Sequence, residues 1–332
     1  MPASILVIQV SRIGDTLLTT PALAAIAAAN PGAKLTVLGH AKRHKVLEHL
    51  PGITTHGTIS KHSAPWRGRL PFKAYDLAFV YGLDAPLVRY ALRVARRVVA
   101  FRQGNPALEA HLAAALPWPA PEHVHWVDRL LALPRALDMP ATTRRIQYQV
   151  TPQEGAEASA RLYAAGLHEA QPCIGLQVAS FPTKAHRDWP IEHFIALTDA
   201  LRARWPGAGF LLYGGPDDRP RTAQLKEKLG ARALDLAGRL SLRQSAAMMS
   251  QTGLYIGVDT GPTHLMSAFD IPMVALYHSL YPSAIYGPLD HPCAELIDHP
   301  GSGRPGASER DAMADIPVEA VLARIERLTL RH

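Results

Sequence analysis

Residues 254–264 read Leu-Tyr-Ile-Gly-Val-Asp-Thr-Gly-Pro-Thr-His, and this stretch decides the kind of fold. The run 254–258 is apolar or small and predicts a buried strand, which Asp259-Thr260-Gly261 ends in a turn. Pro262 suits the first turn of a helix, so a helix is expected next, to about Phe269. A strand that leads into a helix through a short turn is the unit of parallel α/β sheets.

The same unit recurs along the chain in two series, separated by a gap near residues 140–170. Parallel sheets covered on both faces are the simplest account of strands that alternate with helices. We therefore predict two doubly wound α/β domains, at 1–155 and 156–315, and a last helix within 316–332 that could pack on either domain, including back on the N-terminal one. The predicted strands are 5–10, 35–38, 77–81, 98–101, 173–178, 210–213, 254–258 and 273–277, and the predicted helices are 21–30, 41–50, 86–95, 124–137, 190–204, 219–229 and 241–251.

Composition excludes several classes of protein. Of 332 residues, 48% are hydrophobic and 19% are charged, which excludes a disordered chain, collagen and a coiled coil. Two cysteines cannot form a disulfide framework, no apolar run reaches the ~18 residues of a membrane span, and no basic segment precedes residues 5–10. We therefore expect a cytoplasmic protein. The net charge of +7 indicates an anionic partner, which charge alone leaves open between a nucleotide, nucleic acid and an acidic membrane surface.

The turn after the first predicted strand, residues 11–21, carries a glycine, a carboxylate and several hydroxyl groups. Gly14 allows a ligand to approach the backbone closely. Asp15 could cap the following helix or act as a general base, and the local sequence does not separate the two. The turn matches neither the G-x-G-x-x-G dinucleotide motif nor a P-loop.

Three later turns could bind a nucleotide. Residues 180–190 place Lys184, His186 and Arg187 after a strand, where cations could neutralise a diphosphate or form a solvated basic loop. The turn at 259–264 offers amides and threonine hydroxyls to a phosphate, whereas Asp259 is expected to cap the helix or hold a sugar hydroxyl. The turn at 213–218 carries two aspartates that could bind a ribose or cap the next helix.

Together these motifs resemble glycosyltransferase family 9, the lipopolysaccharide heptosyltransferases. The resemblance spans nearly the whole chain, and its most specific parts are Gly14-Asp15 and the Asp-Thr-Gly-Pro-x-His pattern at 259–264. The other matching pieces are Arg12-Ile13, 18–21, Trp189-Pro190, 214–218 and 236–242. The resemblance implies a GT-B fold of two Rossmann-like domains that face a central cleft. It also implies an inverting, metal-independent transfer of heptose from ADP-heptose to the lipopolysaccharide core, with no cofactor beyond this donor substrate.

Site residues carried over from the resemblance fall into three groups. Asp15 matches the family's general base, and Lys184 or Arg187 would neutralise the departing diphosphate. The family usually has Lys where this chain has Arg187, so which cation serves stays open. The positions implied for the donor are Ser180, Asp218, Arg239, Leu240, Asp259, Thr260, Gly261, Thr263 and His264.

The acceptor side is expected to be a basic face of the N-terminal domain, because lipopolysaccharide cores carry phosphates and acidic sugars. Its candidates are Arg12, Gly14, Lys42, Arg43 and Arg67. Arg89, Arg93 and Arg97 would share one face of a continuous helix, although solvated arginines are an equal alternative. The expected partners are a nucleotide-sugar and this anionic acceptor, and peripheral contact with the cytoplasmic face of the inner membrane stays open.

Three alternatives compete with this interpretation. The same fold could use another nucleotide-sugar donor, or it could be a binding protein that has lost catalysis. The presence of Asp15, His264 and the cations Lys184 and Arg187 argues against a binding protein that has lost catalysis. The hypothesis of a nucleic-acid-binding protein rests on the net charge alone. The chain lacks a recognition motif and an aromatic platform for single strands.

Overall fold

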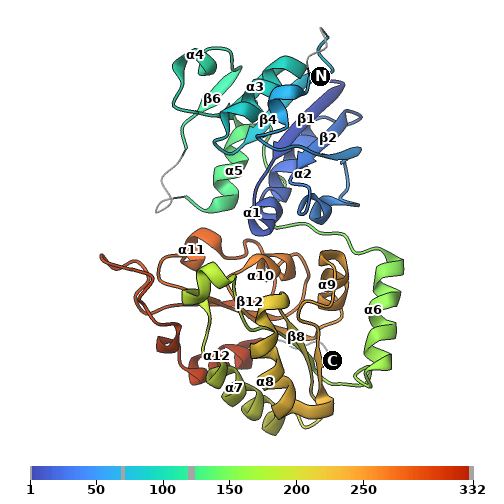
Figure 1. The fold of residues 1–332 in the computed structure, drawn as a ribbon, viewed down its shortest axis with the longest axis vertical. Coiled ribbons are helices and arrows are strands. Elements are labelled where there is room, and N and C mark those ends of the chain that lie inside the picture. Colours follow the sequence, from blue (N-terminus) through green and yellow to red (C-terminus); the bar gives the residue numbers. More distant parts are fainter. Residues whose placement is uncertain (1, 69–71, 119–123, 329–332) are drawn as a thin grey trace. The chain divides into compact units, whose positions relative to one another are not determined.

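The computed structural model describes residues 2–68, 72–118 and 124–328. It divides into two compact units, Met1–Gln149 and Val150–His332, each with its own sheet (Figure 1). The division precedes the predicted boundary at 155 because helix α6 (Pro152–Ala164), in the gap between the two predicted series, packs on α9 (Leu242–Met249) of the second unit.

The sheet of the first unit has six parallel strands in the order β3-β2-β1-β4-β5-β6. Strand β1 lies in the middle, and the run from Ile5 to Ile8 is fully buried, as expected for a strand covered on both faces. The strands are β1 Ser4–Gln9, β2 Lys34–Gly39, β3 Thr55–Thr58, β4 Tyr75–Tyr81, β5 Ala95–Phe101 and β6 Ala114–Leu116.

Helices cover both faces of this sheet. Helix α3 buries Leu87, Val88 and Ala91 against one face, together with a 3₁₀ segment at Ala64–Trp66. Helix α5 packs on β4 and β5, and α2 packs on α5. The helices of this unit are α1 Ile13–Leu18, α2 Thr20–Ala29, α3 Ala85–Val94, α4 Pro106–Glu109 and α5 Trp126–Arg135.

The sheet of the second unit also has six parallel strands, in the order β12-β11-β10-β7-β8-β9. Its four central strands are fully buried from end to end. The strands are β7 Cys173–Gln177, β8 Gly209–Tyr213, β9 Ala233–Asp235, β10 Leu254–Val258, β11 Met273–Tyr277 and β12 Ala294–Asp298.

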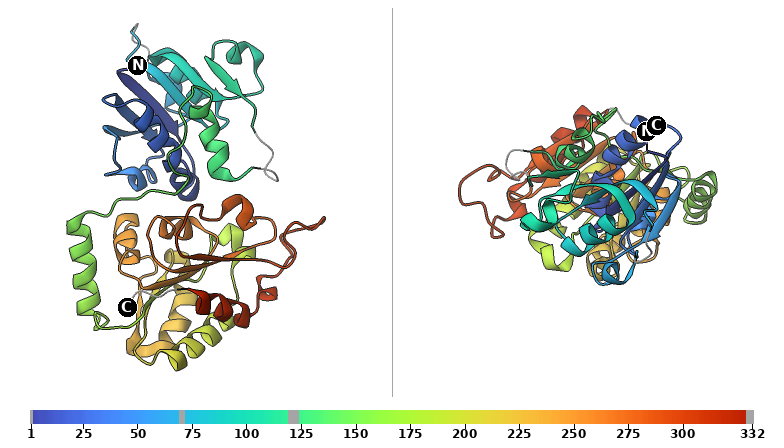
Figure 2. Two further views of the ribbon diagram at one scale, coloured as in Figure 1. Left: turned by 180° about the vertical axis from the view of Figure 1, so that it is seen from behind. Right: turned by 90° about the horizontal axis from the view of Figure 1, so that it is seen from above.

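Helices α7, α8 and α12 lie on one side of this sheet, and α9 and α10 lie on the other (Figures 1 and 2). Phe194, Leu225 and Ile325 of the first three helices share one apolar core with the sheet. Of the two domains left open for the last helix, the structure selects the second, because α12 packs on α7, β11 and β12. The remaining helices are α7 Ile191–Arg204, α8 Arg219–Leu229, α10 Gly261–Met266, α11 Ser283–Tyr286 and α12 Val318–Arg327.

Counted from its own first strand, each sheet follows the order 3-2-1-4-5-6, which is the Rossmann arrangement. The winding reverses between β1 and β4 in the first unit and between β7 and β10 in the second. The strands end level with one another: Gln9 pairs with Gly39 and Tyr81, and Gln177 pairs with Tyr213 and Gly257. Ligands of such sheets bind beyond these ends, at the reversal point.

All eight predicted strands are present, and the four strands that the sequence did not show lie at the sheet edges: β3, β6, β9 and β12. They are short or lack a continuous buried apolar run, because an edge strand has a neighbour on one side only. The helix predicted at 41–50 is reduced to a 3₁₀ turn at His44–Leu47.

The shared helical face of Arg89, Arg93 and Arg97, one of two alternatives left open by the sequence, does not form. Helix α3 ends at Val94, and β5 begins at Ala95, so Arg97 lies in a strand and pairs with Leu77. The apolar run that follows belongs to the sheet, and strand pairing therefore ends the helix before it reaches Arg97.

Among the described residues, none of the helices has the length and apolar character that a membrane span needs.

A carboxylate holds the first helix of the second unit in place. Glu154 completes a capping box with Thr151 and also accepts hydrogen bonds from Arg243 of α9, one of them 2.6 Å from Nη2 to Oε2. Both side chains of the ion pair are mostly buried. The hydrogen bonds from Arg243 lower the pKa of Glu154 to about 2, although burial opposes the change.

We predict that Glu154→Gln lowers the free energy of unfolding by about 1–3 kcal/mol, because Arg243 loses its charged partner. Since the folded-state pKa is depressed, this contribution is complete above the ordinary value of 4.5 and is lost as the pH falls toward 2. Urea unfolding at pH 7 and pH 3 measures both effects. Glu157→Gln, an exposed carboxylate of the same helix, is the control, and equal stability of the two variants at pH 7 would contradict the prediction.

Candidate active site

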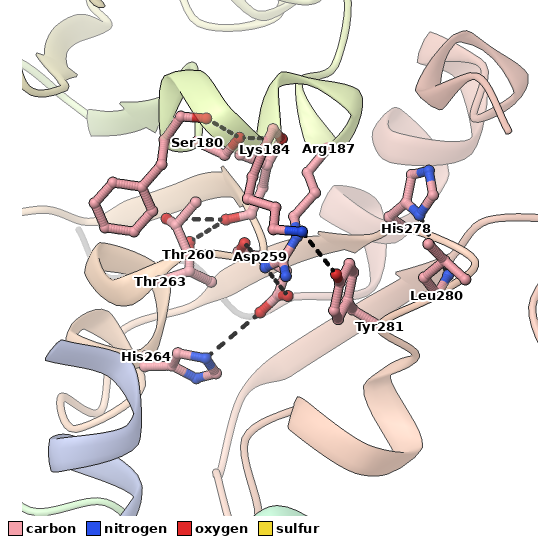
Figure 3. A network of polar contacts seen from close by, with 12 residues as sticks. Ser180, Lys184, Arg187, Asp259, Thr260, Thr263, His264, His278, Leu280 and Tyr281 are labelled. Atoms are coloured by element: carbon pink, nitrogen blue, oxygen red, sulfur yellow. Dashed lines mark hydrogen bonds and ion pairs between the residues drawn. The ribbon is translucent and has the colours of Figure 1, made fainter. Parts of the chain in front are cut away.

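The candidate site of the second unit lies where its strands end, around the turn after β10 (Figure 3). Asp259 follows Val258 directly, and Gly261 begins α10. The first amides of a helix have no intrahelical acceptor, so this turn offers N–H groups to a ligand. Pro262 stands at the start of the helix, where its missing N–H is not needed.

Asp259 is the centre of a charged network. It is 3% exposed, and a buried carboxylate needs a charged or hydrogen-bonding partner. Arg187 donates from Nη1 to Oδ2 at 3.1 Å and to the carbonyl oxygen of Asp259 at 3.4 Å. His264 Nε2 lies 3.5 Å from Oδ1. The predicted Asp259 and His264 therefore meet, and the predicted cation Arg187 joins them.

Tyr281 connects the two candidate cations. The guanidinium carbon of Arg187 lies 3.5 Å from the centre of the Tyr281 ring. Lys184 Nζ donates to the Tyr281 hydroxyl at 3.3 Å and to Glu309 Oε1 at 3.2 Å. Burial raises the pKa of Tyr281, but hydrogen bonds from Arg187 and Lys184 and their charges outweigh it, so the pKa lies below its usual value.

The two cations differ in their surroundings. The side chain of Arg187 is 16% exposed, and its pair with Asp259 is nearly sealed from solvent. Lys184 is 25% exposed, and its partner Glu309 is 61% exposed. Arg187 Nε is buried and has no hydrogen-bond partner among the described residues, so it remains as a donor. Both cations follow the end of β7, and Arg187 is the more buried of the two.

Ser180 positions the loop that carries these cations. Its hydroxyl donates to the carbonyl oxygen of Lys184 at 2.6 Å, and its N–H donates to Asp188 Oδ1 at 2.6 Å. These bonds close the 3₁₀ segment Pro182–Arg187. Trp189, which is fully buried, fixes the far end by donating from Nε1 to the carbonyl oxygen of Ile316 at 2.8 Å.

The two threonines of the Asp259 turn face the sheet. Thr263 donates to the carbonyl oxygen of Val258 at 2.6 Å and lies 3.0 Å from the hydroxyl of Tyr255, so its single hydroxyl hydrogen is used inside the protein. The prediction that Thr263 offers a hydroxyl donor to a phosphate is therefore wrong, because the side chain points back toward β10. Thr260 is 7% exposed and its hydroxyl lies 3.4 Å from the same carbonyl oxygen.

The turn after β8 is fixed by its own aspartate. Asp218 Oδ2 accepts the N–H of Gly215 at 2.7 Å, and burial raises the pKa of Asp218. Gly238, with φ at +61°, lies against this turn, where an added Cβ would come 2.7 Å from Pro216 Cα. Asp218 stands at the N-cap of α8 but makes no side-chain cap bond to it, so its carboxylate closes the turn before the helix rather than capping the helix.

Two of the positions implied for the donor, Arg239 and Leu240, follow β9. Arg239 is 61% exposed and lies 3.7 Å from Asp235, while Leu240 is half-buried. Both therefore lie beside the end of the same sheet, at its β9 edge.

In the first unit, Asp15 lies in the first turn of α1, after β1. Arg12 is the residue that caps this helix, and it does so without a side-chain bond, so Asp15 is not the cap. Instead its Oδ2 accepts the hydroxyl hydrogen of Ser11 at 2.6 Å. Arg43 donates from Nη1 to the carbonyl oxygen of Ser11 at 3.0 Å, so it steadies the same turn.

The other acceptor candidates are more scattered. Gly14 is part of α1, and Arg12 and Lys42 are exposed. Arg67 donates to the carbonyl oxygen of Thr58, the last residue of β3, and lies 5.9 Å from the ring centre of Tyr90. The structure thus places Asp15 and Arg43 on one turn and Arg67 at another strand end of the same sheet.

Tyr281, Glu309, His186 and His278 are site neighbours that sequence reasoning did not single out as a group. His186 and His278 have ring centres 4.9 Å apart, and Nε2 of His278 lies 2.9 Å from the carbonyl oxygen of Asp311. The turn that begins at His278 was visible as a strand end, but nothing in the sequence related it to Arg187. Within residues 2–68, 72–118 and 124–328, no three His, Cys, Asp or Glu side chains lie together as a set of metal ligands.

Comparison with known proteins identifies the family. The model of glycosyltransferase family 9 (heptosyltransferase) matches residues 99–297. The chain is 26% identical over 306 residues to lipopolysaccharide heptosyltransferase 1 of Escherichia coli O18:K1:H7, covering 85% of this chain and 88% of that protein. It is 25% identical over 171 residues to lipopolysaccharide core heptosyltransferase OpsX of Haemophilus influenzae, covering 47% of this chain and 48% of that protein.

A solved structure supports the fold. The E. coli ADP-heptose lipopolysaccharide heptosyltransferase II superposes with a TM-score of 0.77 at 21% identity, covering 98% of each chain. Two parallel Rossmann-type sheets in one chain, with this likeness, show the GT-B fold. With more than half of its length matched by the family model, this chain belongs to glycosyltransferase family 9 and is a glycosyltransferase.

Proposed function

We propose that this glycosyltransferase moves a heptose from ADP-heptose to the lipopolysaccharide core, with inversion at the anomeric carbon and without a metal ion. The observation that carries the proposal is the pair of cations, Arg187 and Lys184, beside the Asp259 turn at the reversal point of the second sheet. The similarity to proteins named as lipopolysaccharide heptosyltransferases supports the sugar and the acceptor.

The proposed roles of the donor-binding residues follow from the charge that develops during the transfer. The bond that breaks joins the sugar's anomeric carbon to the diphosphate, and negative charge grows on the leaving oxygen as it breaks. Cations already fixed in place stabilise such charge without having to reorganise. Arg187 and Lys184 would supply these cations, amides of the first turn of α10 would add donors, and Asp259 and His264 would hold the sugar hydroxyls.

The acceptor side rests on Asp15. As an acceptor hydroxyl oxygen attacks the anomeric carbon from the face opposite the diphosphate, its proton would pass to the Asp15 carboxylate. The hydroxyl of Ser11 holds one oxygen of that carboxylate, which orients the other. One displacement of this kind inverts the configuration of the sugar.

The acceptor itself would be the phosphorylated and acidic inner part of lipopolysaccharide. Arg12, Lys42, Arg43 and Arg67 would provide the basic face that binds it. Since such a glycolipid is anchored in a membrane, we place the enzyme in the cytoplasm, at the surface of the inner membrane.

We predict that Asp15→Asn lowers kcat by about 10²–10⁴-fold, because an amide cannot accept the proton. Binding of ADP to the variant should stay within about twofold, since Asp15 belongs to the acceptor side of the proposal. Asp138→Asn in the same unit is the control, at a positive φ that asparagine tolerates. Retention of full activity by Asp15→Asn would show that another group is the base.

Arg187→Met should weaken ADP binding by about tenfold or more, and Lys184→Met by less, because a buried, well-held cation loses more than a partly exposed one. Calorimetric titration of both variants against Arg202→Met, an exposed arginine of α7, measures the difference. A larger loss in Lys184→Met would assign the main diphosphate contact to Lys184 instead.

The donor can be identified by titrating the wild-type enzyme with ADP, UDP and GDP, and by assaying transfer from ADP-heptose. We expect ADP to bind at least about tenfold more tightly than the others, because a site built for one base leaves polar groups unpaired with another. A preference for UDP or GDP would favour the alternative of another nucleotide-sugar donor. Binding of ADP without any transfer would favour a silent binding protein.

A further inference from the structure

Arg187 is held on two sides by different kinds of contact. In the plane of the guanidinium group, Nη1 bonds Asp259 Oδ2 at 3.1 Å. Above that plane, the Tyr281 ring lies with its centre 3.5 Å from the guanidinium carbon (Figure 3). A guanidinium is flat and delocalised, so it can stack on an aromatic face while its edge forms hydrogen bonds. An ammonium group cannot make both contacts in this way.

Tyr281 also holds the second cation, through a different part of its side chain. Lys184 Nζ donates to the phenol oxygen at 3.3 Å and lies 5.8 Å from the ring centre. Arg187 therefore contacts the ring face and also hydrogen-bonds the hydroxyl, and Lys184 hydrogen-bonds the hydroxyl. Two positive side chains brought together would repel each other, and Tyr281 offers each of them an attractive contact.

The two cations come from one 3₁₀ segment, Pro182–Arg187, whereas Tyr281 comes from the turn after β11. Tyr281 is half-buried, and it contacts the ring of His186 at 6.2 Å between centres and that of Tyr286 at 6.0 Å. The contact with Tyr286, which lies outside the segment that carries the cations, helps to fix the ring, as a support for a binding site requires.

From this geometry we propose that Tyr281 is a positioning residue that holds Arg187 and Lys184 as a two-cation cradle for the β-phosphate of the donor, and that the stacking makes arginine necessary at position 187. This inference rests on the proposed function, because it takes a nucleoside diphosphate as the ligand. Tyr281 acts through the two cations and is not assigned any contact with the substrate.

The test uses the full chain and measures the affinities for ADP and for AMP, which lacks the β-phosphate. Tyr281→Leu removes both contacts and should weaken ADP binding by about tenfold while changing AMP binding by less than about threefold. Tyr281→Phe keeps the stacked ring and should recover most of the ADP affinity. Loss of folding would lower both affinities together, so the ratio of ADP to AMP affinity reports the positioning role.

A double-mutant cycle tests the link to arginine. Arg187→Lys should weaken ADP binding by about tenfold in the natural chain but by less than about threefold when Tyr281 is already Leu, because the stacking it removes is then absent. Tyr163→Leu, an exposed tyrosine of α6, is the control and should change neither affinity.

The possible results of these titrations distinguish the role of Tyr281 from the proposed function. Equal effects of Arg187→Lys in both backgrounds, or equal losses of ADP and AMP affinity in Tyr281→Leu, would overturn the role of Tyr281 and leave the proposed donor intact. If the natural chain binds neither ADP nor the ADP-sugar, the proposed function fails as well, and the inference fails with it.

Discussion

The buried charge of Asp259 is the constraint on which the second unit's site depends. The carboxylate lies at the end of β10 with 3% exposure, and an uncompensated charge there would cost several kcal/mol. Arg187 supplies the compensating charge, and His264 Nε2 lies 3.5 Å from the second carboxylate oxygen. Arg187 reaches Asp259 because Ser180 and Asp188 close the loop that carries it. The ion pair between Asp259 and Arg187 therefore links the turn after β10 to the loop after β7.

The parallel sheets explain why these groups meet at all. In each unit, the central strands run in one direction and end level with one another, so the turns that follow them gather at one edge. Asp15 follows β1 in the first unit, and the Asp259 network follows β7 and β10 in the second. Both lie at the reversal point of their own sheet. The repeated strand order thus gives the chain two equivalent places for ligands, which a two-substrate transfer requires.

Much of the fold could be predicted from the sequence, and the missing parts share a physical cause. The eight predicted strands include every central strand, because burial on both faces requires a continuous apolar run. Strands β3, β6, β9 and β12 escaped prediction because they lie at edges, where pairing with a neighbour decides the structure. Helix α6 was not predicted, because only Ala158 and Leu162 on it are buried and its sequence therefore shows little apolar periodicity.

The candidate site, like the fold, could be predicted from the sequence only in part. By itself, the sequence determined the central strands, the turns that follow them and the residue types that those turns carry, since these depend on local patterns of burial and turn formation. Only the tertiary structure decided which side chains meet: that Asp259 pairs with Arg187, and that Tyr281 contacts both Arg187 and Lys184. Such contacts join residues about 70 to 100 positions apart, and they arise from strand order and level strand ends, which no local pattern encodes.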